Sequence, residues 1–162
     1  MTNNESKGIV LVVDDSADAL GMLNESLANE GYTVFVAMDG VQALAVAGRM
    51  APDIVLMDAI MPNMDGFQAC KALKSNSELN DVPVIFMTGL SESENVIKGF
   101  EVGGVDYINK PVKLDELLAR VKVHLNNSRM TRSARVALDE VGQLTFACDI
   151  NGQIVWSTAH VR

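Results

Sequence analysis

Residues Asp53-Ile-Val-Leu-Met-Asp58-Ala-Ile-Met-Pro62-Asn-Met-Asp65-Gly66 decide the fold of this chain. The apolar run 54–57 is short and is followed by a loop with proline and glycine, which predicts a strand buried on both faces. Asp58 then stands at the carboxyl end of that strand. In open parallel sheets, ligands bind in the crevice beyond these strand ends. The stretch therefore predicts a site at that edge, provided that other strands bring complementary groups to it.

The composition fits one domain with a short additional segment. The chain has 162 residues, and 48% of them are hydrophobic, which is enough to build a core. Its net charge of −8 argues against a nucleic-acid-binding surface within the chain. Cys70 and Cys148 are isolated from each other and from any metal-ligand pattern. No apolar run has the length of a membrane span or the position of a secretory signal, so we expect a cytoplasmic protein without membrane contact.

Further apolar runs predict strands at 8–13, 33–37, 83–87 and 105–108, and a helical pattern follows each strand. The apolar stripes expected to face the core are Leu20, Leu23 and Leu27; Val41, Leu44 and Ala45; Phe67, Cys70 and Leu73; Val96, Ile97 and Phe100; and Leu114, Leu117, Leu118, Val121 and Leu125. Strands that alternate with helices require crossover connections. We therefore predict an α/β fold, a doubly wound five-stranded parallel sheet of order 2-1-3-4-5 with helices on both faces.

Polar side chains follow four of these strands at the same expected edge. They are Asp14 and Asp15, Asp58, Thr88 and Lys110. Carboxylates this close raise one another's pKa unless a divalent cation neutralises them, and an all-oxygen site favours Mg²⁺. A carboxylate can accept a phosphoryl group, Lys110 can pair with a phosphoryl oxygen, and the Thr88 hydroxyl can hydrogen-bond another. The sequence therefore predicts a Mg²⁺-dependent site that accepts a phosphoryl group.

The motifs around these residues resemble the receiver domain of bacterial two-component response regulators, the CheY-like family. They are Val12-Val13-Asp14-Asp15, Leu56-Met57-Asp58, Met61-Pro62-Asn63-Met64-Asp65-Gly66, Met87-Thr88-Gly89 and Asp106-Tyr107-Ile108-Asn109-Lys110-Pro111. The resemblance implies a flavodoxin-like fold and a receiver domain over residues 1–126. It also implies a signalling module and not an enzyme.

The resemblance further implies how the phosphoryl group is received. Asp58 is expected to be the phosphoacceptor, and a sensor histidine kinase or a phosphotransfer protein is the expected donor. Asp15 is expected to bind Mg²⁺ directly with Asp14 in support, and Asp58 and the backbone carbonyl of Ile60 complete the protein's share of the metal ligands.

The resemblance also implies a switch. Thr88 is expected to be the switch hydroxyl, Lys110 the phosphate-pairing cation and Tyr107 the aromatic residue that changes rotamer. The Lys110–Pro111 peptide bond is expected to be cis, which proline permits. The remodelled surface lies on the fourth helix, fifth strand and fifth helix, where homodimerisation is common in this family.

Two apolar residues are expected to set the lifetime of the phosphorylated state. Ile60 stands two positions after Asp58, and Leu90 stands two positions after Thr88. At both positions relatives often carry polar side chains. We hypothesise that Ile60 and Leu90 hinder the water that attacks the acyl phosphate.

Residues 127–162 are expected to form a helical linker and a β-hairpin. The runs 144–148 and 153–156 flank Asn151-Gly152, and Asn-Gly between such runs favours a hairpin. Residues 137–156 are similar to the start of a PAS-like module, which this chain holds only in part. Arg129, Arg132 and Arg135 on the linker form either a solvated face or a docking surface for an acidic partner.

Two alternatives to the phosphorylated receiver remain. One is a receiver-like interaction module that phosphorylation does not control, and the presence of all five polar groups speaks against it. The other is a phosphatase or phosphotransferase of the haloacid-dehalogenase type, which needs a second carboxylate two residues after its nucleophile. Ile60 occupies that position and speaks against such an enzyme.

Overall fold

The computed structural model describes residues 6–89 and 93–144 of the chain. The chain divides into two units, Met1–Leu125 and Asn126–Arg162. The first unit holds the sheet and the residues of the predicted site.

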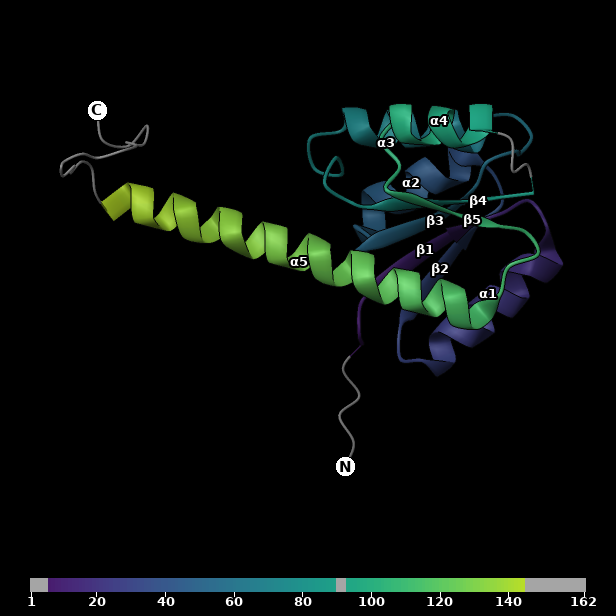
Figure 1. The fold of residues 1–162 in the computed structure, drawn as a ribbon, viewed down its shortest axis with the longest axis horizontal. Helices are drawn as coiled ribbons and strands as arrows, with labels where there is room; N and C mark the ends of the chain where they lie inside the picture. The colour runs from purple at the N-terminus through teal and green to yellow at the C-terminus, as the bar shows by residue number, and fades with distance from the viewer. Residues whose placement is uncertain (1–5, 90–92, 145–162) are drawn as a thin grey trace. The chain divides into compact units, whose positions relative to one another are not determined.

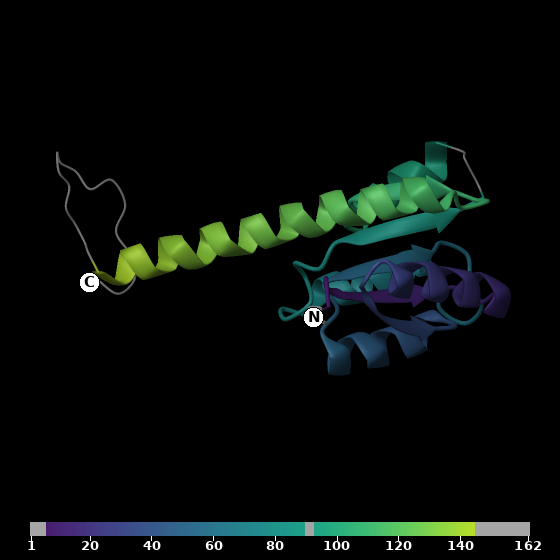
Figure 2. The same cartoon turned by 90° about the horizontal axis from the view of Figure 1, so that it is seen from below.

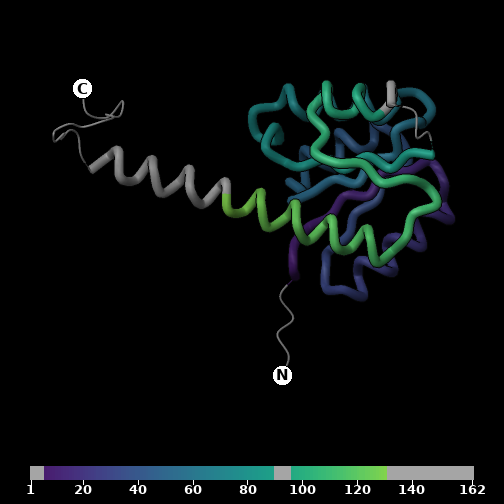
Figure 3. The backbone as a smooth tube through the Cα atoms, viewed as in Figure 1, coloured from purple at the N-terminus to yellow at the C-terminus, as the bar shows by residue number. Residues whose placement is uncertain are grey.

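Strands and helices alternate along the first unit, and the crossovers between parallel strands can be followed in the backbone trace (Figure 3). The elements are β1 (Ile9–Val13), α1 (Ala17–Asn29), β2 (Thr33–Ala37), α2 (Gly40–Met50), β3 (Ile54–Asp58), α3 (Gly66–Ser75), β4 (Val84–Thr88), α4 (Ser93–Glu101), β5 (Asp106–Asn109) and α5 (Leu114–Leu144). All strand pairs are parallel, and the sheet order is β2-β1-β3-β4-β5. The predicted fold class is confirmed.

Two apolar layers hold the sheet between its helices. One layer packs α2 and α3 against the sheet, and the other packs α1 and α5 against the opposite face. Figure 1 shows α2, α3 and α4 on one side of the strands, and Figure 2 shows the side that carries α1 and α5. β3 is buried along its whole length because helices cover both of its faces.

The predicted core stripes of α1, α3 and α5 are confirmed. In α2, Leu44 is partly buried against the core as predicted, whereas Val41 and Ala45 are exposed and the prediction for them is wrong. The buried residues of α2 are Gly40, Ala43 and Ala47, and Val41 is 56% exposed. The side chain of Asp39 accepts a hydrogen bond from the Gln42 backbone and so fixes where the helix begins. The helix then turns its small residues to the sheet, which allows a close approach and leaves Val41 in solvent.

Helix α4 also departs from the predicted pattern. Ile97 and Phe100 were expected to face the core, but 55% of Ile97 and 49% of Phe100 is exposed. Gly99 is the buried residue of this stretch, and a Cβ there would lie 3.1 Å from the Phe86 ring. Ile97 and Phe100 therefore form an exposed apolar surface on α4, while Val96 is half-buried in the predicted direction.

Helix α5 continues past the end of the first unit, with bounds Leu114–Leu144. The predicted linker is thus helical as far as Leu144. The predicted hairpin at 144–156 and the PAS-like resemblance lie outside the described residues beyond that point. Among the described residues, no helix combines the length and the apolar character that crossing a membrane requires.

Candidate functional site

The register of the sheet brings three of the predicted side chains to one edge. Val13 at the end of β1 pairs with Met57 of β3, so Asp14 and Asp58 follow directly on neighbouring strands. Asp58 pairs in turn with Met87 of β4, and Thr88 comes next. This edge is the place where the strand order reverses, which is where open α/β sheets bind ligands.

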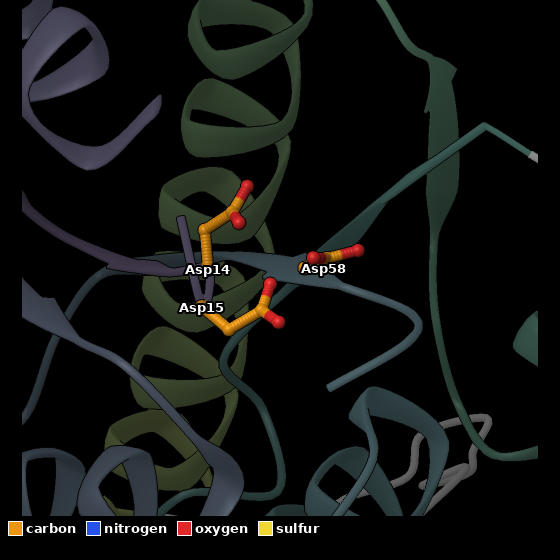
Figure 4. Close-up of side chains that lie close together, drawn as sticks. All are labelled: Asp14, Asp15 and Asp58. Atoms are coloured by element: carbon orange, nitrogen blue, oxygen red, sulfur yellow. The ribbon is translucent and has the colours of Figure 1, made fainter. Parts of the chain in front are cut away.

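Three carboxylates converge at this edge. Oxygen atoms of Asp14, Asp15 and Asp58 all lie within 4.8 Å of one another. Figure 4 shows Asp14 and Asp15 at the end of one strand with Asp58 beside them. Asp14 is 1% exposed and Asp58 is 5% exposed, whereas Asp15 lies on the surface. The cluster is thus open to solvent on the side of Asp15.

Lys110 joins the cluster from the end of β5. Its Nζ lies 3.1 Å from Asp58 Oδ2 and 3.2 Å from Asp14 Oδ2. The Lys110 backbone N–H donates to the Thr88 carbonyl at 2.9 Å, which ties the loop after β5 to the end of β4. The Lys110–Pro111 peptide bond is cis, as the resemblance to receiver domains implies.

The other carboxylate oxygens accept backbone hydrogen bonds. Ser16 N–H donates to Asp14 Oδ1 at 2.9 Å, and Ile60 N–H donates to Asp58 Oδ1 at 3.3 Å. These bonds fix the direction of both side chains.

The negative charges of the cluster outnumber its positive charges. Burial, together with the charge of Asp14, raises the pKa of Asp58 from 3.8 to about 6, although Lys110 and the Ile60 N–H oppose the change. Burial lowers the pKa of Lys110, but the hydrogen bond to Asp58 and the negative charges of Asp58 and Asp14 outweigh it and hold that pKa above its usual value. One lysine therefore only partly neutralises three carboxylates.

This arrangement fits a divalent cation. Among the described residues, Asp14 Oδ2 is the buried side-chain oxygen that accepts no hydrogen bond, with only the ion pair to Lys110 beside it. The donors at the cluster are all oxygen atoms, which suit Mg²⁺. A positive charge at this point would relieve the repulsion that raises the pKa of Asp58.

The loop between β3 and α3 is held tightly beside the cluster. A Cβ at Gly66 would collide with the backbone carbonyl oxygen of Asp58, and Gly66 N–H donates to Ala59 O at 2.9 Å. Within the loop, 54% of Ile60 is exposed at the mouth of the site. Its predicted counterpart Leu90 lies outside the described residues.

Contacts with the start of α2 support the same loop, and the sequence analysis did not identify them. Asn63 has a φ of 68° and its side chain donates to Asp39 Oδ2 at 3.4 Å. A Cβ at Gly40 would lie 2.8 Å from Met64, so the loop packs directly on the first turn of α2. Asp39-Gly40 is a readable helix start, but only the folded chain shows what the start contacts.

A small cavity lies behind Thr88. Its volume is about 10 Å³, room for about one water molecule, and Tyr107 lies in its wall. The remaining wall residues come from the ends of β3, β4 and β5 and from α3 and α4: Ala59, Phe67, Phe86, Thr88, Val96, Gly99, Phe100 and Asp106. The two predicted switch residues thus share one cavity.

Comparison with known proteins agrees with this geometry. A family model described as the response regulator receiver domain matches residues 10–122. The chain is 42% identical over 113 residues to the response regulator PleD of Caulobacter vibrioides, covering 70% of this chain and 25% of PleD. It is 40% identical over 119 residues to the DNA-binding response regulator MtrA of Mycobacterium tuberculosis, covering 74% of this chain and 51% of MtrA.

Solved structures give the same result. The chemotaxis response regulator CheY4 of Vibrio cholerae superposes with a TM-score of 0.69 at 32% identity, covering 74% of this chain and 98% of CheY4. The chain spans between 25% and 53% of the length of the curated relatives described as response regulators or master regulators.

Proposed function

The chain belongs to the response regulator receiver domain family, and on this premise we propose that Asp58 accepts a phosphoryl group from a sensor histidine kinase or a phosphotransfer protein. The observation that carries the proposal is the position of Asp58, a buried carboxylate beside two others and a lysine at the edge where the strand order reverses. Burial and the charge of Asp14 disfavour the ionised form of Asp58, so a cation or a covalent bond that reduces the negative charge of this carboxylate stabilises the site.

The reaction is a phosphoryl transfer. A carboxylate oxygen of Asp58 forms a bond to phosphorus while the bond between phosphorus and the donor, a histidine nitrogen or a small acyl phosphate oxygen, breaks. The departing group leaves with the bonding electron pair. The product is an acyl phosphate on Asp58, which water later hydrolyses back to the carboxylate.

The other residues of the site position the groups and balance their charge. Lys110 already lies 3.1 Å from Asp58 Oδ2, so it can pair with a phosphoryl oxygen after a small movement. Asp15, Asp14 and the Ile60 carbonyl, with Asp58, are the residues that would hold Mg²⁺. When bound, Mg²⁺ supplies positive charge that offsets the developing charge on the phosphoryl oxygens.

We propose that Thr88 and Tyr107 respond to the added charge. Thr88 moves toward the phosphoryl group, and the Tyr107 ring moves inward behind it. The cavity beside Thr88 has room for about one water molecule, which is less than a phenol ring needs. Val96, Gly99 and Phe100 of α4 line the cavity, so we propose that α4 shifts when the Tyr107 ring moves into the space that Thr88 leaves.

The proposed output face comprises α4, β5 and the first turns of α5. Ile97, Phe100, Val105 and Val123 expose much of their apolar surface there. We propose that this face mediates homodimerisation in the phosphorylated state and thereby controls a downstream output. MtrA is described as a DNA-binding response regulator, and the part of it that matches this chain is 51% of its length. The nature of this chain's output, including the PAS-like segment expected at residues 137–156, stays within the proposal.

Phosphorylation with a small donor tests the proposed function. We expect acetyl phosphate with Mg²⁺ to label the wild-type protein with one phosphoryl group by intact mass, and Asp58→Asn to remain unlabelled. Asp18→Asn makes the same chemical change on the exposed first turn of α1 and is expected to label normally. A wild-type protein that takes up neither phosphoryl group nor beryllofluoride would overturn the proposal and leave an interaction module.

A further inference from the structure

A charged cluster joins β5 to α5 next to the cavity behind Thr88. It consists of Asp106, Arg120 and His124, and we call it the Asp106 cluster. Arg120 Nη1 lies 2.7 Å from both carboxylate oxygens of Asp106, and His124 Nε2 lies 2.9 Å from Asp106 Oδ2. Because the ionised carboxylate only accepts hydrogen bonds, His124 Nε2 is the donor. Arg120 also pairs with Glu116 at 3.1 Å, one turn earlier on α5.

The Asp106 carboxylate also touches the switch residue. Its Oδ1 accepts a hydrogen bond from the Tyr107 backbone N–H at 2.8 Å. Asp106 and Tyr107 both line the cavity. The Asp106 side chain therefore contacts the Tyr107 backbone and two residues of α5 at the same time. The cluster is partly shielded from water, with 18% of the Asp106 side chain and 19% of the His124 side chain exposed.

The apolar layer of α5 includes Ile108 of β5, whereas Tyr107 of β5 packs against the opposite layer. Leu117, Val121 and Leu125 face the core layer shared with α1, on the sheet face opposite the layer that contains Phe67 and Phe86 of the cavity wall. Asp106 reaches from the cavity wall to α5 through its ion pair with Arg120 and its contact with His124. Charge-assisted hydrogen bonds of this geometry are directional and strong.

From these contacts we infer that the Asp106 cluster couples the switch cavity to α5, with Asp106, Arg120 and His124 as positioning residues. The inference rests on the proposed function. When Tyr107 moves inward, the start of β5 moves with it, and Asp106 transmits that displacement to α5 through Arg120 and His124. The cluster thus adds a charged link at the start of β5 to the apolar layer that Ile108 of β5 shares with α5.

The test measures two responses to beryllofluoride and Mg²⁺ in the whole chain. Binding at Asp58 is followed by fluorine NMR, and the response of α5 is followed by amide hydrogen exchange over residues 114–130. In the wild-type protein we expect binding and a change of exchange in α5. In Asp106→Asn we expect normal binding, while the change in α5 exchange falls roughly threefold or more, within the range for residues that carry coupling.

Two further variants make the result decisive. His124→Gln removes one contact without touching the residue beside Tyr107, and we expect an intermediate reduction if Asp106→Asn is too unstable to measure. Asp115→Asn makes the matched change on the exposed first turn of α5 and is expected to respond as the wild type does. Normal binding with an undiminished α5 response in both Asp106→Asn and His124→Gln would overturn the coupling role alone. Failure of the wild-type protein to bind beryllofluoride would overturn the proposed function and the coupling role with it.

Discussion

The environment of Asp58 disfavours the ionised form of its carboxyl group. Burial raises its pKa to about 6, and the neighbouring Asp14 carboxylate adds to the effect. The same features that destabilise the charged side chain make it a good acceptor once a cation and a phosphoryl group are present. The sequence predicted the carboxylate, its two neighbours and Lys110, because each follows an apolar strand whose end could be read.

Removing the charge of Asp58 is expected to stabilise the metal-free protein. Near pH 7.5 with chelator present, Asp58→Asn should raise the free energy of unfolding by about 1–3 kcal/mol, since roughly two pKa units of unfavourable ionisation disappear. Urea unfolding monitored by circular dichroism measures the change. The folded state binds the Asp58 proton more tightly than the unfolded state does, so the wild type loses this stability as pH rises from about 4 to 6.

Magnesium provides the control for that experiment. Mg²⁺ is expected to raise the stability of the wild type and to have a much smaller effect on Asp58→Asn, because the variant lacks one of the three carboxylates. Equal stabilisation of both proteins by Mg²⁺ would contradict a metal site at this cluster.

Ile60 is expected to slow loss of the phosphoryl group. It lies half exposed at the mouth of the site, and its N–H donates to Asp58 Oδ1 at 3.3 Å. A polar side chain there can orient the attacking water, so Ile60→Asn should speed dephosphorylation roughly two- to tenfold, a barrier change of up to about 1.4 kcal/mol. Decay of the phosphorylated protein over time, measured by intact mass, gives the rate. Ile60→Val keeps the apolar character and should decay at the wild-type rate; equal rates for all three proteins would rule the idea out.

At the scale of elements, the loop between β3 and α3 depends on Gly66. A side chain there meets the Asp58 carbonyl, so Gly66→Ala should cost about 1–3 kcal/mol of stability through overpacking. It should also slow phosphorylation by acetyl phosphate, because the loop carries Ile60. Gly48 on the exposed face of α2 has open space around it, and Gly48→Ala should stabilise by about 0.5–1 kcal/mol. Urea unfolding that shows no difference between the two variants would contradict the tight loop.

The contact between β5 and α5 gives a pH dependence of opposite sign. Burial alone would raise the pKa of Asp106, but the hydrogen bonds from His124 and Arg120 outweigh it and hold that pKa below its usual value. Stability from this contact is therefore full near neutral pH and is lost as pH falls below about 4. Asp106→Asn should cost about 1–2 kcal/mol at pH 7, reduced by solvent screening of Arg120, and the difference should narrow in acid. Paired urea titrations at pH 7 and pH 3.5 measure it, and a difference that does not change with pH would contradict the assignment.

Helix boundaries were easier to predict than helix orientation. The start of α2 at Gly40 could be read from Asp39, yet Val41 and Ala45 of the predicted stripe are exposed because Ala43 and Ala47 face the sheet. Hydrophobicity alone favours large side chains for the core, whereas close packing of a helix on a sheet favours small ones. The support that Asn63 receives from Asp39 was also hidden, because it joins residues that only the fold brings together.

For the molecule as a whole, pairing with a second copy would bury the exposed apolar residues of α4 and the exposed Val105 just before β5. The spacing of Ile97 and Phe100 predicted that they lie in the core. Both are exposed, so they form an apolar patch on the surface. A change of α4 forced by Tyr107 would then alter the very residues that meet the partner copy. The proposed dimer thus rests on the exposed apolar surface of α4, which lies beside the cavity that Tyr107 lines.

Self-association is the prediction that tests this face. With beryllofluoride and Mg²⁺ the wild-type protein is expected to dimerise, and Ile97→Glu should weaken the dimer by about tenfold or more, since it places a buried charge at the contact. Sedimentation velocity over a range of concentrations measures the association. Met22→Glu puts the same charge on an exposed apolar residue of α1 and should dimerise as the wild type does. Both variants must still bind beryllofluoride, because neither residue touches the site. A dimer that survives Ile97→Glu, or that Met22→Glu abolishes, would move the interface away from α4 and β5.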